Sequence, residues 1–218
     1  MSQTQECAPT PTLSAYIPSS RRRIFHYDCG NAMLAAILKQ GNGREVWGAT
    51  HREEQSEDAR QHLDKTLSVV DPQRPVFSLP EAYFDGMIVE NALERTRYPA
   101  ELLKRCAGAL SEGGFLALVI HNAQHHDVVF SLAEGRWNPQ PGQLRFFTAY
   151  ETARLLDKCG FDAKGYAPFE RDPDDALSFD AEGYARRGNF VIGPVAENER
   201  NAWLTRRYIF LAQKTERR

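Results

Sequence analysis

Three histidines follow the most apolar run of the chain and are its best candidates for acid–base chemistry. The run spans residues 115–120, and His121, His125 and His126 come after it. An imidazole changes its protonation near neutral pH, so a histidine at the end of a buried strand can accept a proton from a bound molecule. We predict that His125, within the spacing Asn122-x-x-His125, is the first candidate for a catalytic base or for a contact with the molecule that accepts the transferred group. His121 is the second candidate.

The same histidines are also candidates for metal ligands. A zinc site usually takes three or four His, Cys or carboxylate ligands, and the only carboxylate at ligand spacing here is Asp127. The four cysteines are far apart and form no Cys-x-x-Cys pair: Cys7, Cys29, Cys106 and Cys159. We therefore expect no metal site, and we expect reduced thiols in a cytoplasmic protein.

These side chains need a framework, and short strand-like and helix-like runs alternate along the chain. The predicted strands span residues 24–27, 45–49, 67–70, 84–89, 115–120, 161–168 and 206–213. The predicted helices span residues 32–39, 53–65, 99–110 and 149–159. This alternation predicts an α/β fold with a doubly wound sheet, in which a ligand binds at the carboxyl ends of the strands.

Length and charge limit the classes of protein to consider. The chain has 218 residues, of which 42% are apolar, and a net charge of −2. This composition is typical of one globular domain, and we expect neither a nucleic-acid nor a membrane partner. Residues 1–20 are polar and rich in proline, so we predict an N-terminal tail or arm. Residues 21–218 form the predicted domain, with the polar segment 170–201 as an insertion or lid before the last strand.

Five short motifs occur in an order that resembles a known family. They are Cys29-Gly30-Asn31, Tyr83-Phe84-Asp85, Asn91-Ala92-Leu93-Glu94-Arg95, Leu110-Ser111-Glu112-Gly113-Gly114, and a block with Gly135-Arg136-Trp137 and Leu144-Arg145-Phe146-Phe147-Thr148. In these motifs the chain resembles the class I (Rossmann-like) S-adenosylmethionine (SAM)-dependent methyltransferases of the small bacterial type, over about residues 15–169. The resemblance implies a single domain with a seven-stranded, mostly parallel sheet whose last strand is antiparallel. It also implies SAM as cofactor, bound across the ends of strands one, two and four.

The glycine turn that the resemblance implies is degenerate. In the ungapped register the family's Asp-x-Gly-x-Gly-x-Gly motif falls on His26, Asp28, Gly30 and Ala32. A shift by two residues would instead make Asp28 the motif acid. We favour the ungapped register, which puts the Asp28 carboxylate into a turn that receives the carboxylate of SAM, a repulsive arrangement unless Asp28 points away.

Three further positions complete the implied cofactor site. Thr50 stands where the family has the acid that accepts both ribose hydroxyls, and Glu53 or Glu54 could take over that contact. Asp71 matches the acid that accepts a hydrogen bond from the adenine amino group, but it could equally make only an Asp-Pro turn. Asn91, at the end of the fourth strand, lies where the methyl group of the cofactor is expected.

The acceptor side is predicted from the most specific motif. Arg136, Trp137 and Arg145 are expected to form the floor or lid beside the acceptor pocket, and Arg145 could hold an anionic group such as a phosphate or a carboxylate. Glu90, next to Asn91, could contact the cofactor or the acceptor.

Two functions follow from the resemblance, and a third remains open. The first is methyl transfer from SAM to a small-molecule or glycan-type acceptor. The second is a catalytically inactive protein of the same fold, acting as a binding, regulatory or partner subunit, either with a protein partner or as a homodimer. It is indicated by the changes at His26, Asp28, Ala32 and Thr50. The third is a related fold that binds another nucleotide or a sugar nucleotide, although the chain has no phosphate-binding glycine run.

Overall fold

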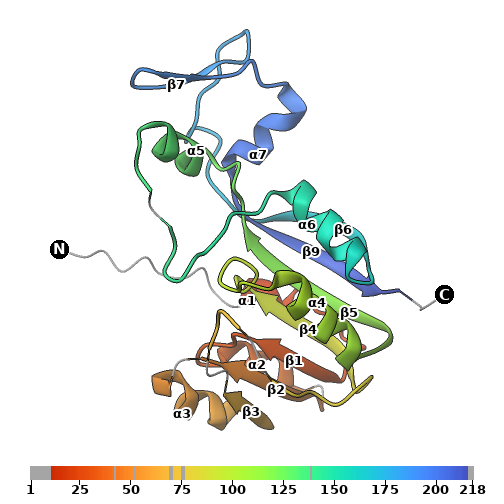
Figure 1. Cartoon of the computed structure of the whole chain (residues 1–218). Coiled ribbons are helices and arrows are strands. Elements are labelled where there is room, and N and C mark those ends of the chain that lie inside the picture. The colour runs from red at the N-terminus through yellow and green to blue at the C-terminus, as the bar shows by residue number, and fades with distance from the viewer. Residues whose placement is uncertain are drawn as a thin grey trace.

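The computed structural model describes residues 11–215, except 42, 52, 69, 70, 75, 76 and 138, and its centre is a seven-stranded sheet (Figure 1). The strand order is β3-β2-β1-β4-β5-β9-β6, and β9 runs antiparallel to β5 and β6 while the other pairs are parallel. The strands are β1 (Arg23–Tyr27), β2 (Glu45–Thr50), β3 (Lys65–Ser68), β4 (Phe84–Glu90), β5 (Leu110–His121), β6 (Phe161–Arg171) and β9 (Thr205–Lys214). The predicted mostly parallel α/β sheet with an antiparallel last strand is thereby confirmed.

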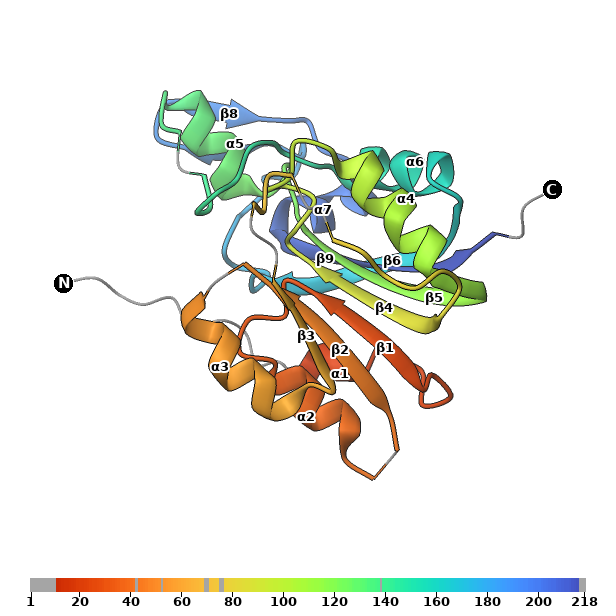
Figure 2. The same cartoon turned by 60° about the horizontal axis from the view of Figure 1, so that its bottom comes forward.

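Helices cover both faces of this sheet (Figure 2). Apolar side chains of α1, α2 and α3 pack on one face, and those of α4 and α6 pack on the other. The bounds are α1 (Pro11–Ser14), α2 (Met33–Lys39), α3 (Glu53–His62), α4 (Pro99–Ala109) and α6 (Ala149–Lys158). Strands covered on both faces must be apolar on both sides, which explains the continuous run of buried residues from Leu116 to Ile120 in β5.

A smaller lobe lies at the carboxyl end of β5, at the top of Figure 1. Two separate parts of the chain build it: α5 (His126–Ala133), and the segment after β6 that contains β7 (Ala185–Arg187), β8 (Phe190–Ile192), the short η1 (Glu197–Glu199) and α7 (Arg200–Leu204). Phe130 of α5 packs with Leu177, Ala185 and Leu204 in a separate small core. The lobe therefore has its own apolar interior.

Several element boundaries differ from the predicted ones. The helix predicted over 53–65 ends at His62, because the Asp64 carboxylate accepts the backbone N–H of Val46 at 2.7 Å and thereby turns the chain into β3. The fifth strand begins at Leu110 rather than at residue 115, and the sixth continues to Arg171 because it stays paired with β9. The segment predicted as an insertion or lid, residues 170–201, contains the β7–β8 hairpin and the start of α7.

Two further expectations concern the state of the cysteines and the presence of a membrane-spanning helix. Cys29, Cys106 and Cys159 are buried and free, and Cys7 lies outside the described residues. Within the described part of the chain, no helix has the length and apolar character needed to cross a membrane.

Candidate active site

The turn after β1 keeps an unusual backbone shape although most of its glycines are replaced. Asp28, Gly30 and Ala32 have φ angles of 59°, 55° and 58°. Glycine adopts this left-handed region without strain, whereas the conformation raises the free energy of a residue with a Cβ atom by about 1 kcal/mol. The three angles fall on the three glycine positions of the ungapped register, so the backbone favours that register over the shifted one.

The Asp28 carboxylate is paired with two side chains that follow the neighbouring strands β2 and β4. Its Oδ1 lies 3.0 Å from Nδ1 of His51, which follows β2, and its Oδ2 accepts a hydrogen bond from Nη1 of Arg95 at 2.6 Å. Arg95 belongs to the loop after β4. The repulsion expected between Asp28 and a ligand carboxylate is therefore offset by a guanidinium at the same place.

His26, at the motif acid position, is a core residue. It is 3% exposed, and neither ring nitrogen has a hydrogen-bond partner among the described residues. Burial lowers the pKa of His26 to about 4, because the charged ring would lose its hydration. The ring is therefore neutral at physiological pH and does not replace the charge of the motif acid.

The two positions predicted for ribose and adenine differ in exposure. Thr50, the last residue of β2, is buried and carries no charge, and the side chains of Glu53 and Glu54 lie outside the described part of the structure. Asp71 is exposed, and its Oδ1 accepts the backbone N–H of Gln73 at 2.9 Å. Asp71 therefore makes the Asp-Pro turn, and its Oδ2 accepts no hydrogen bond from the described residues.

Glu90 and Asn91 end β4 at the centre of this edge. Asn91 has a φ of 50°, and its Oδ1 is buried without a partner among the described residues. Burial raises the pKa of the Glu90 carboxyl, although Nη1 of Arg207, at 3.2 Å, partly opposes that rise. Arg207 is itself buried and also donates from Nε to Glu170 of β6 at 2.6 Å. At this edge the backbone of Asn91 is therefore strained, and the Glu90 carboxyl is largely removed from water.

His121 ends β5 at the same edge. Its backbone N–H donates to Oε1 of Glu94 at 2.6 Å, and its ring Nδ1 lies 3.4 Å from the same oxygen. The His121 side chain is 29% exposed, whereas that of Glu94 is 3% exposed.

His125 and His126 lie in a different setting, under the lobe. His125 caps α5: its Nδ1 accepts the backbone N–H of Asp127 at 3.3 Å, and its Nε2 lies 3.0 Å from Oδ2 of Asp172. Nε2 of His126 lies 3.1 Å from the same oxygen. Burial lowers the pKa of His125, and the charge of His126 adds to this effect. His125 therefore has both ring nitrogens engaged by the protein.

The same cluster contains four side chains of metal-ligand type. One ligand atom from each of His125, His126, Asp127 and Asp172 lies within 4.8 Å of the others. The guanidinium of Arg206, however, donates from Nη2 to both carboxylates, at 3.0 Å to Asp127 and 2.9 Å to Asp172. Arg206 thus supplies the positive charge that a metal ion would bring to these carboxylates.

The predicted acceptor-side residues lie in the loop between α5 and α6. Arg136 is exposed and pairs with Glu134, and Trp137 is exposed and meets the Phe146 ring edge-on at 4.9 Å. Arg145 donates from Nη2 to the Arg97 carbonyl at 3.1 Å, and its buried Nε has no partner among the described residues. This loop therefore packs on the loop after β4.

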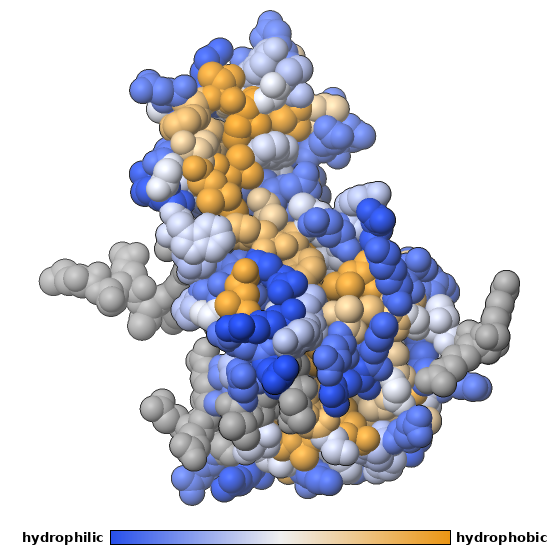
Figure 3. Space-filling model, viewed as in Figure 1, coloured by the Kyte–Doolittle hydropathy of each residue, from blue (hydrophilic) through white to orange (hydrophobic). Residues whose placement is uncertain are grey.

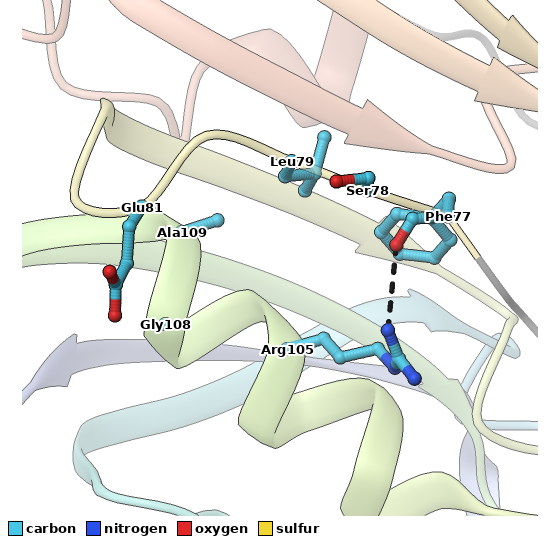
Figure 4. Close-up of a pocket in the computed structure, with 7 residues that line it drawn as sticks. All are labelled: Phe77, Ser78, Leu79, Glu81, Arg105, Gly108 and Ala109. Carbon is cyan, nitrogen blue, oxygen red and sulfur yellow. Dashed lines mark hydrogen bonds between the residues drawn. The ribbon is translucent and has the colours of Figure 1, made fainter.

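The surface has two further features near these elements. Figure 3 shows apolar side chains gathered on the lobe, whose exposed large apolar residues include Leu132, Phe190 and Val191. A groove of about 490 Å³ lies between residues 77–81 and the end of α4 (Figure 4), where Arg105 donates to the Phe77 carbonyl at 3.5 Å. The groove leads to the starts of β4 and β5, so it is separate from the carboxyl edge.

Sequence reasoning missed four side chains that shape this edge. Glu94 and Arg95 lie inside a motif that supported the resemblance, but that motif implied no contact for them. His51 and Arg207 carry no local signal, because their partners Asp28 and Glu90 are far away in sequence. Only the position of each residue at the end of a predicted strand could have pointed to them.

Comparison with known proteins agrees with the fold described above. The family model described as a methyltransferase domain matches residues 26–118. A SAM-dependent methyltransferase from Archaeoglobus fulgidus superposes with a TM-score of 0.69 at 17% identity, covering 94% of this chain and 92% of that one. The [4+2]-cyclase SpnF superposes with a TM-score of 0.64 at 17% identity, covering 98% and 84%.

A third structure was solved with a protein partner. A chain from the Haloferax volcanii complex between the Trm112 methyltransferase activator and its methyltransferase superposes with a TM-score of 0.59 at 14% identity, covering 90% of this chain and 83% of that one. A search of curated proteins by sequence found no match. At these identities the structures establish the fold, and the family model adds the sequence pattern of the first five strands. Residues 26–118 therefore match the methyltransferase-domain family, and the whole chain has the fold of the class I SAM-dependent methyltransferases.

Proposed function

We propose that this protein transfers a methyl group from SAM to a hydroxyl of a small-molecule or glycan-type acceptor. The observation that carries the proposal is the turn after β1. Asp28 and Ala32 hold left-handed φ angles that only a glycine adopts freely, so the backbone shape of the cofactor turn is retained against local strain. Strain of this kind persists where the surrounding structure requires that particular shape.

The residues of this edge fit most parts of the cofactor. The backbone N–H groups of Gly30 and Asn31 donate to none of the described residues, and Arg95 lies beside them as a cation for the cofactor carboxylate. Among the described residues, nothing donates to Oδ2 of Asp71 or to Oδ1 of Asn91, so the first could accept the adenine amino group and the second could contact the cofactor. Thr50 fits less well, because it replaces two carboxylate oxygens with one buried hydroxyl. When bound, SAM supplies an electrophilic methyl group on a sulfonium.

His121 is the base in this proposal, in preference to His125. A hydroxyl acceptor must lose a proton as its oxygen attacks the methyl group, and a positioned imidazole can take that proton. His125 has both nitrogens occupied by Asp127 and Asp172, whereas His121 ends β5 at the carboxyl edge, as Glu90 ends the neighbouring β4. Arg136, Trp137 and Arg145 form one wall of the acceptor pocket in this scheme.

The catalytically inactive alternative also has an observation in its favour. The contacts of Asp28 with His51 and Arg95 connect the ends of β1, β2 and the loop after β4, which is the place that SAM would cross. If these contacts do not open, the fold would serve as a binding or regulatory subunit with a protein partner. The Haloferax volcanii complex is an example of this fold with such a partner. In both cases the free buried cysteines suit a reducing compartment such as the cytoplasm.

Calorimetric titration with SAM and with its demethylated product distinguishes these functions. We expect micromolar binding of both ligands, and at least tenfold weaker binding in the Asp71→Ala variant. Asp157→Ala, an acidic substitution on α6, is the matched control and should bind like the wild type. An absence of heat at millimolar ligand would exclude the methyltransferase proposal and favour the partner subunit.

A further inference from the structure

Glu94 is a buried acid whose environment satisfies only half of its carboxylate. The residue is 2% exposed, and Oε1 accepts the backbone N–H of His121 at 2.6 Å. Its Oε2 is buried and has no hydrogen-bond partner among the described residues. A buried carboxylate oxygen without a donor destabilises a fold, so this oxygen calls for an explanation beyond packing.

The His121 ring lies beside this acid. Nδ1 is 3.4 Å from Oε1 of Glu94, so it is the ring nitrogen that the carboxylate can engage. Such a contact shortens readily when a ligand closes the site, because catalytic hydrogen bonds are often long in the free protein. The His121 side chain is partly exposed, and Nε2 is the ring nitrogen that does not face Glu94.

We propose that Glu94 is a positioning residue that holds the Nδ1–H tautomer of His121 and so keeps the Nε2 lone pair directed at the acceptor. This inference rests on the proposed methyl transfer. As the C–O bond forms and the C–S bond breaks, the C–S electron pair stays on sulfur and the hydroxyl proton moves to Nε2 of His121. The resulting imidazolium is stabilised by the Glu94 carboxylate and later returns the proton to water.

His125 and His121 differ in the groups that face their ring nitrogens. A neutral imidazole has one N–H and one lone pair. In His125 the Nδ1 lone pair is used by the Asp127 N–H, and Nε2 donates its proton to Asp172. In His121 a carboxylate oxygen lies 3.4 Å from Nδ1, and a proton on Nδ1 leaves the lone pair on Nε2.

The tautomer can be measured directly by long-range ¹H–¹⁵N NMR of the imidazole rings at a pH where they are neutral. The His121 signals are assigned by their loss in His121→Gln. We expect the Nδ1–H tautomer in the wild-type protein, although free imidazole side chains prefer Nε2–H. Glu94→Gln keeps an acceptor oxygen and should keep this tautomer, whereas Glu94→Leu should switch His121 to Nε2–H. The control Glu101→Gln, on the exposed face of α4, should change nothing.

An Nε2–H tautomer in the wild-type protein would overturn the assignment, even if Glu94→Leu fails to fold. So would an unchanged tautomer in a folded Glu94→Leu protein, because Glu94 would then serve only the backbone of β5. The readout requires neither SAM nor an acceptor, so it separates this inference from the proposed function. If SAM does not bind but the Nδ1–H tautomer is present, the proposed methyl transfer is rejected, whereas the positioning of His121 by Glu94 is supported.

Discussion

The carboxylate of Asp28 lies 2.6 Å from Nη1 of Arg95, which joins the turn after β1 to the loop after β4. This pair lies at the edge formed by the carboxyl ends of parallel strands, where open α/β sheets generally bind their ligands. An acid in this turn is unfavourable for an anionic ligand, but an acid that is already paired with a guanidinium is close to neutral. Under the proposed function, the same pair would determine how strongly the turn can attract the carboxylate of SAM.

Replacing Asp28 with asparagine should strengthen SAM binding. The negative charge is removed while the side-chain shape is kept, so Arg95 becomes available to the cofactor carboxylate. We expect the Kd for SAM to fall about 5- to 10-fold, equivalent to about 1 kcal/mol. Calorimetry checks this, with Ala32→Gly as a control that changes the turn without changing its charge. Weaker binding in Asp28→Asn would mean that the carboxylate itself contacts the cofactor.

The Asp172 carboxylate should hold the lobe against the sheet. Burial alone would raise the pKa of Asp172, but its hydrogen bonds with Arg206 and His125 outweigh this and lower it. Because the pKa is lower in the folded protein, the stabilisation is complete above about pH 4 and is lost as the pH falls through the folded value. Asp172→Asn should cost about 2 kcal/mol near pH 7, since it leaves Arg206 without its main partner.

Limited proteolysis and amide exchange in α5 and residues 173–204 measure that loss. Local opening of the lobe should increase 5- to 30-fold for a change of this size. Asp174→Asn is the matched control, because the Asp174 side chain is 88% exposed. Equal protection in the two variants would show that the lobe is held by its own apolar core instead.

His26 should make the stability depend on pH. Burial lowers its pKa to about 4, whereas in the unfolded chain it is near 6.5. The unfolded state therefore binds more protons between these values, and stability that is present above pH 6.5 is lost as the pH falls toward 4. We expect about 2 kcal/mol of this loss between pH 8 and pH 5. Urea denaturation at both pH values should show a smaller difference in His26→Leu, and an equal one would contradict the assignment.

Two glycines should respond to alanine in opposite directions. A Cβ atom on Gly48 of β2 would lie 2.6 Å from Cδ1 of Leu63 and 2.8 Å from Sγ of Cys29, so overpacking should cost about 1–3 kcal/mol. Gly108 of α4 has no atom within 4 Å of an added Cβ, and alanine favours a helix by about 1 kcal/mol. Thermal melts of the two variants test this, and destabilisation by Gly108→Ala would contradict it.

The sequence by itself determined the sheet and the elements that follow each strand. Residues 115–120 form a continuous apolar run because β5 is covered on both faces, and the alternation of strands with helices is set by local periodicity. The order of the strands and the position of the carboxyl edge also follow, through the resemblance to class I methyltransferases. Boundaries were less accurate where a tertiary contact set them, as at Asp64.

Only the tertiary structure decided what the polar side chains do at that edge. His125 and His121 look equivalent in sequence, yet Asp172 engages the first from a segment 47 residues away, while Glu94 lies beside the second. In the same way, Arg95 reaches Asp28 across 67 residues. Local patterns report which face of a strand is buried, because burial repeats along the chain. They carry no record of which distant side chain completes an ion pair, since that depends on how the strands are ordered in the sheet.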